Sequence, residues 1–251
     1  MLEIKNLSAV IDKKQILSNI SLKLTPHTIT AVIGKNGCGK STLVSCINQT
    51  TPYTGEIAFS GRNISLMQPK ERACLLSILP QTLTAPHITV DELVKMGRSP
   101  YIDIGRHFTQ TDKDAVAQAV NTIGISELEN CFIDEISGGE RQKAYLAMTL
   151  AQDTRVMILD EPTTYMDMAY EHAFMVLLDK LKKKHKKTLL VIMHNLNQAV
   201  RHADRIAVMD GGRLIFEGST AECLDSQVIE QTFGVKRYKA DDRIFFSAEQ
   251  I

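Results

Sequence analysis

The sequence predicts an α/β fold that carries an inserted helical segment, and three observations support this class. Residues 2–33 contain short alternating or wholly apolar segments, which are typical of strands. A helical pattern then extends from about residue 86 to residue 152. After residue 156, short apolar runs alternate with helical segments again. A chain of 251 residues suits one domain, or one large domain with a subdomain.

The individual elements follow from the same patterns in chain order. Residues 2–4 and 20–24 alternate between apolar and polar side chains, and residues 29–33 form an apolar run that leads into a glycine. A helix is expected at about residues 40–48, followed by a pair of strands within residues 55–66. The later expected elements are helices at 90–94, 112–123, 139–151 and 169–184, and buried strands at 156–159 and 189–193.

The composition is that of an ordinary soluble protein, with 44% hydrophobic and 23% charged residues. The 29 basic and 29 acidic residues cancel, so the charge gives no indication of a nucleic-acid surface. The five cysteines are an odd number without a CxxC pair, which favours a reducing cytoplasm over a disulfide framework. We expect no secretory signal, and no apolar run approaches the ~20 residues of a membrane helix. A membrane role would therefore require a partner.

Residues 34–41 match the phosphate-binding pattern GxxxxGK[ST], and they lie between an expected strand and an expected helix, as this motif requires. Glycines allow a tight turn that directs backbone N–H groups at phosphates, and the helix N-terminus adds a favourable dipole. We expect Lys40 to reach the β- and γ-phosphates and the Ser41 hydroxyl to bind Mg²⁺. The expected ATP-binding residues of this loop are Gly34, Lys35, Asn36, Gly37, Cys38, Gly39, Lys40, Ser41 and Thr42.

Two acidic residues, Asp160 and Glu161, end the apolar run at residues 156–159. In phosphate-loop enzymes, a carboxylate in the place of Asp160 helps to hold Mg²⁺. Glu161 follows at the carboxyl edge of the expected sheet, where nucleotides bind. It could polarise the attacking water as a general base, a role typically worth about 10²–10⁴-fold in rate.

A helix start is expected at Ser137, because Ser137 and Glu140 have the spacing of a capping box before a periodic helical run. The N–H groups at Gly138 and Gly139 would stay open, and such a helix end binds anions. The segment from Ile136 to Glu140 also resembles the signature motif of ABC-family ATPases, whose commonest form is LSGGQ.

The order of the motifs along nearly the whole chain strengthens this resemblance. It implies a P-loop NTPase (RecA-like) core with an antiparallel β subdomain and an inserted α-helical subdomain. The expected ABC ATPase domain spans residues 1–235, with its core at 1–82 and 153–235 and the helical subdomain at about 83–152. Residues 236–251 are expected to form a short C-terminal tail.

The resemblance also implies that two ATP molecules lie between two copies of the chain in a two-fold symmetric dimer. Ser137, Gly138, Gly139 and Glu140 would hold the γ-phosphate bound to the other subunit's phosphate loop. Gln81 resembles a glutamine that contacts Mg²⁺ and senses the membrane partner. Asp167 resembles the D-loop residue at the dimer interface, and His194 resembles the switch histidine near the γ-phosphate. The expected catalytic residues are Lys40, Gln81, Glu161 and His194, and the expected metal ligands are Ser41, Gln81 and Asp160.

Two positions depart from the family pattern. The family usually has an aromatic side chain that stacks on adenine just after the first strand, and the alignment places Ile11 there. Apolar contact would then replace stacking on the adenine. Glu140 replaces the commoner glutamine of the signature. We expect the helix cap and the activity to survive this change, although a negative charge near the γ-phosphate could loosen the closed dimer.

Residues 89–101, TVDELVKMGRSPY, resemble the TVxELVxxGRxP stretch of ATPases that serve iron–siderophore, haem and cobalamin importers. The resemblance implies a groove around Gln81 to Arg106 that receives a coupling helix of a transmembrane permease. An extracytoplasmic substrate-binding protein would deliver the cargo. The expected function is ATP hydrolysis that powers import of an iron–siderophore or related metal chelate. The chain would lie peripherally on the cytoplasmic face of the cell membrane.

Other functions stay open at this point. An ATPase of a zinc or manganese importer, or of an exporter, would carry the same motifs. A DNA-repair or chromosome-structural ATPase would need long coiled-coil insertions before the signature, and the chain has no sustained heptads. A ribosome-associated ABC protein usually has two cassettes, whereas this chain has one.

Overall fold

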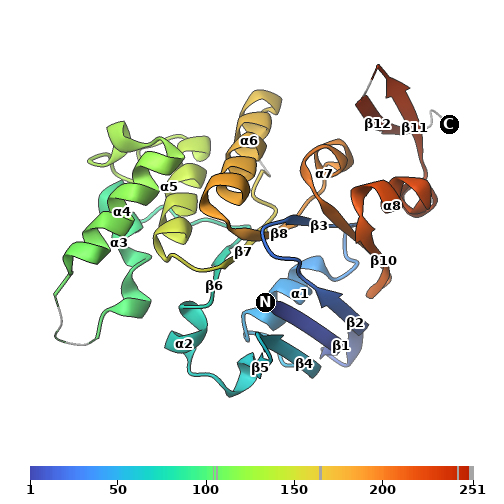
Figure 1. The fold of residues 1–251 in the computed structure, drawn as a ribbon, viewed down its shortest axis with the longest axis horizontal. Coiled ribbons are helices and arrows are strands. Elements are labelled where there is room, and N and C mark those ends of the chain that lie inside the picture. Colours follow the sequence, from blue (N-terminus) through green and yellow to red (C-terminus); the bar gives the residue numbers. More distant parts are fainter. Residues whose placement is uncertain (104, 106, 164–165, 242, 249–251) are drawn as a thin grey trace. The chain divides into compact units, whose positions relative to one another are not determined.

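The computed structural model describes residues 1–103, 105, 107–163, 166–241 and 243–248 of the chain (Figure 1). The chain divides into two compact units. The first unit comprises Met1–Leu66 and Asp179–Ile251, and the second unit comprises Met67–Leu178.

An antiparallel sheet in the order β2-β1-β4-β5 opens the first unit. Its strands are β1 (Leu2–Ile11), β2 (Lys14–Lys23), β4 (Thr54–Phe59) and β5 (Arg62–Asn63). Strands β1 and β2 are longer than the sequence pattern indicated, because register shifts interrupt the apolar alternation along the pair. The two strands are joined by Asp12 and Lys13, both with positive φ, as in the tight turns that suit β-hairpins.

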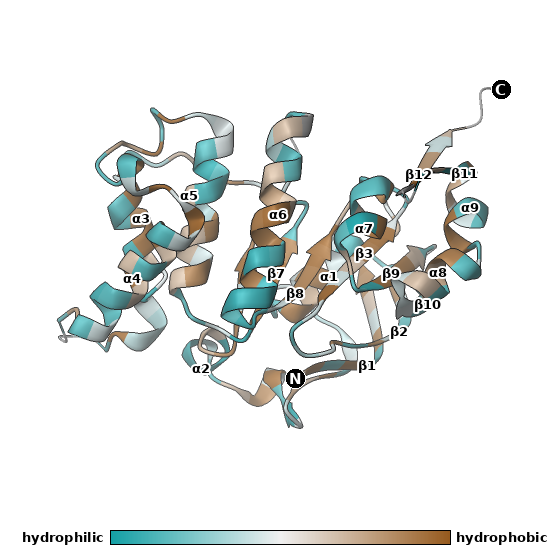
Figure 2. Ribbon diagram, turned by 45° about the horizontal axis from the view of Figure 1, so that its top comes forward, coloured by the Kyte–Doolittle hydropathy of each residue, from teal (hydrophilic) through white to brown (hydrophobic). Residues whose placement is uncertain are grey.

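The second sheet of this unit contains buried parallel strands at the two apolar runs that the sequence predicted, residues 29–33 and 189–193. Strand β3 (Ile29–Gly34) pairs in parallel with both β8 (Thr188–Ile192) and β9 (Arg205–Asp210), and β10 (Arg213–Ser219) pairs antiparallel with β9. Every residue of β3 and β8 is buried. In Figure 2, β3 and β8 are largely brown, which agrees with strands that have apolar side chains on both faces.

Short helices and a C-terminal hairpin complete the first unit. The helices are α1 (Lys40–Ile47), α7 (Leu196–His202), α8 (Thr220–Asp225), α9 (Val228–Phe233) and the 3-10 turn at Ile64–Leu66. Helix α6 (Met168–His185) crosses the division between the two units in sequence. Among the described residues, no helix combines the length and the apolar character that crossing a membrane would require.

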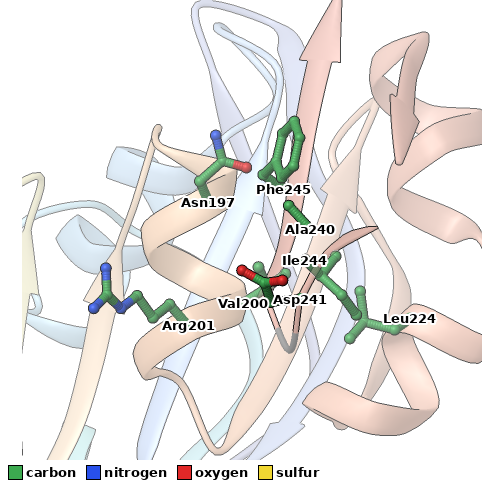
Figure 3. Close-up of a pocket in the computed structure, with 8 residues that line it drawn as sticks. All are labelled: Asn197, Val200, Arg201, Leu224, Ala240, Asp241, Ile244 and Phe245. Carbon is green, nitrogen blue, oxygen red and sulfur yellow. The ribbon is translucent and has the colours of Figure 1, made fainter. Parts of the chain in front are cut away.

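The region of the expected C-terminal tail contains a β-hairpin of β11 (Val235–Ala240) and β12 (Arg243–Ala248). The Asn197 side chain of α7 donates to the Phe246 carbonyl at 3.3 Å and accepts from the Phe246 N–H at 2.6 Å, which fixes the hairpin. A pocket of about 920 Å³ opens between the hairpin, α7 and α8 (Figure 3). It is lined by Asn197, Val200, Arg201, Leu224, Ala240, Asp241, Ile244 and Phe245.

The second unit contains one parallel strand pair and most of the longer helices. Strand β6 (Leu76–Leu79), which the sequence did not predict, pairs in parallel with β7 (Val156–Asp160). The helices are α2 (Pro69–Ala73), α3 (Val90–Met96), α4 (Gln110–Ile123) and α5 (Gly138–Ala151), with 3-10 turns at Ser99–Tyr101 and Ser126–Leu128. The expected helices near 90–94, 112–123 and 139–151 are thereby confirmed.

A buried ion pair ties the helices of the second unit together. The Arg98 Nε atom lies 3.0 Å from an Asp112 carboxylate oxygen, and both side chains are buried. Arg98 also donates to the Ala151 carbonyl at 2.8 Å, near the end of α5. Each charge therefore has a partner, which a buried ion pair requires.

Candidate active site

The phosphate loop connects β3 to α1, as the motif predicted. The Lys40 ammonium donates to the carbonyl of Gly34 at 2.7 Å and to the carbonyl of Lys35 at 3.2 Å. Lys40 is only 5% exposed, so its charge lies over the loop and not in bulk solvent. A cation in this place can attract the phosphates of a nucleotide cradled by the loop.

Two glycines of the loop are required by the geometry. A Cβ atom on Gly34 would lie 2.4 Å from the Met209 carbonyl oxygen. Gly39 has φ of 103°, and a Cβ atom there would lie 2.6 Å from a methyl carbon of Leu17. A larger side chain at either position would displace the loop backbone.

The start of α1 presents further anion-binding groups. The first backbone N–H groups of a helix have no intrahelical acceptor, and the helix dipole makes this end positive. Ser41 and Thr42 lie in this first turn and are at least partly exposed. The loop thus offers backbone N–H groups and a lysine that can donate to the phosphates of a nucleoside triphosphate. It also offers a hydroxyl oxygen that can ligate the accompanying Mg²⁺.

Cys38 lies within the same loop and is buried. Burial raises the pKa of its thiol, while the nearby Lys40 charge lowers it and so opposes the rise. The net effect disfavours the thiolate, which is the reactive form of cysteine. Cys38 therefore fits a role as a small side chain within the loop.

His194 follows the strand next to the phosphate loop. Val32 of β3 is in register with Ile192 of β8, and the Met193 N–H donates to the Val32 carbonyl at 3.0 Å. Parallel strands end at the same edge of a sheet, so His194 and Gly34 leave the sheet at neighbouring positions. His194 is exposed there.

Ile11 ends β1 beside the hairpin turn and is 39% exposed. An exposed isoleucine at a strand end is suited to apolar contact with a planar ring. Its role towards adenine stays a prediction.

In the second unit, the strand register brings Gln81 and Glu161 together. Leu79 of β6 is opposite Leu159 of β7, and Gln81 and Glu161 each follow two residues later. The Gln81 amide donates to the Glu161 carboxylate at 2.5 Å. Glu161 is 8% exposed, and its φ of 50° is uncommon for a residue other than glycine. Such backbone strain is often found at functional sites.

Asp160 immediately precedes this pair at the end of β7. It is 7% exposed, so its carboxylate is largely removed from solvent. A carboxylate at the carboxyl end of a parallel strand has the chemistry to ligate Mg²⁺.

The predicted capping box at the start of α5 is confirmed. The Glu140 N–H donates to the Ser137 hydroxyl oxygen at 3.3 Å, and the Glu140 carboxylate accepts from the Ser137 N–H at 2.9 Å and from its hydroxyl at 2.6 Å. These bonds, led by the one from the hydroxyl, hold the pKa of the Glu140 carboxyl below its ordinary value. Glu140 is therefore negatively charged at neutral pH.

The glycines of the signature are not required by contacts within the described chain. A Cβ atom on Gly138 would meet no described atom within 4 Å, and one on Gly139 would meet only the ring of Tyr170, at 3.5 Å. Gly138 is exposed. A side chain would therefore fit at Gly138 in the single subunit.

Asp167, the expected D-loop residue, lies just before α6. Its carboxylate accepts the backbone N–H of Tyr170 at 2.9 Å. Of the same segment, Thr164 and Tyr165 lie outside the described residues, as does Arg106 at the end of the expected permease groove.

Sequence reasoning missed Tyr170 and Lys143 as neighbours of the signature. The Tyr170 ring faces Gly139, and the Lys143 ammonium lies over that ring, 5.9 Å from its centre. These residues come from two helices that are separated in sequence by a strand, so no local pattern could have indicated the contact.

A phosphate loop with a buried lysine, together with a capped glycine-rich helix start, defines a P-loop NTPase. The ABC transporter family model matches residues 17–164, and the chain belongs to this family of ATP-binding ATPases. It is 36% identical to the ferric enterobactin transport ATP-binding protein FepC of Escherichia coli, over 92% of this chain and 86% of that protein. It is also 36% identical to the petrobactin import ATP-binding protein FpuD of Bacillus anthracis, over 97% of this chain and 90% of that one.

A solved structure resembles the whole fold. The similarity is to a protein described as a metal-chelate type ABC transporter in an inward-facing conformation, with a TM-score of 0.82 and 25% identity. The match covers 98% of this chain and 95% of that chain. The expected α/β P-loop NTPase fold is thus confirmed.

Proposed function

We propose that this ATPase powers an importer of an iron–siderophore or related metal chelate. The observation that carries the proposal is the 36% identity, across nearly the full chain, to subunits named for ferric enterobactin transport and petrobactin import. The TVDELVKMGRSPY segment, which starts α3 with a Thr89–Glu92 capping box, supports the same class. The partners would be transmembrane permease subunits, a second copy of the chain and, indirectly, an extracytoplasmic substrate-binding protein. The chain would then lie on the cytoplasmic face of the membrane.

In the proposed cycle, the phosphate loop of one subunit binds ATP and the signature of a second copy closes over the γ-phosphate. Ser137 and the open backbone at Gly138 and Gly139 would supply donors to that phosphate. The free space around Gly138 supports this role, because an approaching phosphate needs room that a side chain would take. Asp167 would contact the partner across the same interface. Nucleotide can drive closure only if it binds the closed state more tightly.

Hydrolysis would depend on Glu161 as the general base. Its carboxylate would accept a proton from the attacking water, while the Gln81 amide that bonds to it would hold its orientation. His194 would respond to the γ-phosphate. Ser41, Gln81 and Asp160 have oxygen atoms suited to Mg²⁺, which neutralises phosphate charge when bound. Loss of the γ-phosphate would then reopen the dimer and reset the permease.

Transport by reconstituted vesicles tests the proposal. The chain would be co-expressed with candidate permease subunits, purified as a complex and inserted into vesicles loaded with the matching binding protein. We expect ATP to drive a radiolabelled ferric siderophore across the membrane, from the side that holds the binding protein to the opposite side. ATP-dependent movement of free Zn²⁺ or Mn²⁺ alone, or movement in the opposite direction, would contradict the assignment.

The charge of Glu140 leads to a second expectation. Glu140→Gln keeps an oxygen that can accept the Ser137 N–H but removes a negative charge from the signature. In a hydrolysis-deficient background, we expect the two subunits to associate about tenfold more tightly in the presence of ATP. This is the size of effect expected when a partly exposed negative charge near a phosphate is removed. Analytical ultracentrifugation across an ATP titration measures this. Glu127→Gln, at an exposed position of the same unit, is the matched control. An unchanged or weaker Glu140→Gln dimer would mean that this charge does not face the nucleotide.

A further inference from the structure

In the second unit, the segment that follows Gln81 is paired with the segment that leads into the signature. The Ile133 N–H donates to the Ile88 carbonyl at 2.9 Å, and Thr89 and Phe132 form an antiparallel bridge next to this bond. The residues before Ile88 lead back to Gln81, and those after Ile133 lead on to the signature. The pairing therefore joins the approaches to both motifs.

His87 extends this pairing through its side chain. The Asp134 carboxylate accepts from the His87 Nδ1 atom, with its two oxygens at 3.0 Å and 3.2 Å. The imidazole also stacks on the Phe132 ring, with the ring centres 4.2 Å apart and the planes 5° from parallel. His87 immediately precedes Ile88, and Asp134 immediately follows Ile133. These contacts, which we call the histidine clamp, thus lie at the end of the pairing that is nearer to both motifs.

The signature helix α5 holds the same two segments. The buried Tyr145 hydroxyl lies 2.9 Å from the Thr84 hydroxyl and donates to the Thr84 carbonyl at 3.1 Å. Arg141, one turn into α5, donates to the Ile133 carbonyl at 3.2 Å. The segment after Gln81 therefore contacts α5 directly, and it contacts the entry to α5 through the histidine clamp.

The histidine clamp is exposed, which separates its effect on local geometry from an effect on folding. The side chains of His87 and Asp134 are 67% and 38% exposed. Exposed ion pairs contribute little to the stability of a fold. The phosphate loop belongs to the first unit, so ATP binding by a single subunit should not depend on the clamp.

We propose that His87 is a positioning residue which, through Phe132 and Asp134, makes the segment after Gln81 and the entry to the signature move together. This inference rests on the proposed function, in which Gln81 senses the permease and the signature closes over the ATP of a second copy. With the clamp intact, a displacement of the Gln81 segment also displaces Ser137. Without it, the two segments can separate beyond their last backbone bond, and the permease controls the signature less well.

ATP hydrolysis by the complex with the permease, stimulated by cargo-loaded binding protein, tests the clamp. His87→Ala is expected to lower the stimulated kcat by about five- to tenfold, the size of a lost stack and ion pair. The KM for ATP, and binding of a fluorescent ATP analogue to the isolated subunit, should not change. Asp134→Ala should act in the same direction, and the double variant should lose no more than the larger single loss. Asp114→Ala, which removes an exposed carboxylate from the same unit, is the matched control.

A reversed pair separates the contact from a general effect of the substitutions. His87→Asp places two carboxylates opposite each other and should lower the stimulated kcat at least as much as His87→Ala. Combining it with Asp134→Lys restores an ion pair and should recover about threefold. Thermal unfolding of all these variants should stay within a few degrees of the unaltered protein.

Normal stimulation of His87→Ala, additive losses in the double variant or no recovery in the reversed pair would overturn the inference alone. So would an equal loss in the Asp114→Ala control, or a loss of ATP binding that accounts for the lower turnover. If the unaltered complex shows no stimulation by permease and binding protein, the proposed function fails, and the inference fails with it.

Discussion

Glu161→Gln is expected to lower ATP turnover by about 10²–10⁴-fold, the usual contribution of a general base. Glutamine has nearly the same shape, and its amide oxygen can still accept the hydrogen bond from Gln81. Nucleotide binding should therefore survive, and ATP should accumulate in a stable closed dimer. Phosphate release measures the turnover, and retention of labelled ATP on the protein measures the trapped state.

A matched control for this variant is Glu127→Gln, which removes the same charge at an exposed position of the same unit. We expect its turnover to stay normal. Turnover by Glu161→Gln within a few-fold of the unaltered protein would remove Glu161 from the role of general base. Loss of ATP binding would instead point to a structural role for the carboxylate.

Lys40→Ala is expected to weaken ATP binding by roughly 10–100-fold, the range for a lost hydrogen bond to a charged group. The Lys40 ammonium is held by the carbonyls of Gly34 and Lys35, so it is already oriented within the loop. Its removal takes away both the cation and a restraint on the loop backbone. Equilibrium binding of a fluorescent ATP analogue measures the change.

Thermal unfolding separates the two effects of Lys40→Ala. An apo protein that melts normally, but binds ATP weakly, supports the role of the ammonium in phosphate binding. Lys113→Ala provides a lysine deletion at an exposed site and should bind normally. Unchanged affinity in Lys40→Ala would contradict the assignment of this loop.

The parts of the fold that depend on contiguous patterns were predictable from the sequence. The phosphate loop, the strand before Asp160 and the capping box at Ser137 each follow from adjacent residues, and the structure has all three elements. Strand β6 was missed because its four residues, Leu76–Leu79, have no turn signal that separates them from the preceding helix. The C-terminal hairpin was missed because the exposed β11 has a polar, basic sequence.

The site was harder to predict where its contacts are tertiary. Resemblance indicated Gln81 and Glu161 separately, but their hydrogen bond depends on the register of β6 with β7. The contact of Tyr170 with Gly139 joins two helices and leaves no periodic signal in the sequence. Sequence patterns therefore identified the motifs, whereas the residues that position these motifs could be identified only from the packing.

The proposed transport cycle depends on ATP that joins the phosphate loop of one subunit to the signature of another. The decisive measurement is a structure of the Glu161→Gln protein with bound ATP. We expect a two-fold dimer in which each γ-phosphate lies within hydrogen-bond distance of Ser137 and the Gly138–Gly139 backbone of the opposite subunit. An ATP-loaded protein in which the signature of every subunit faces solvent would contradict it.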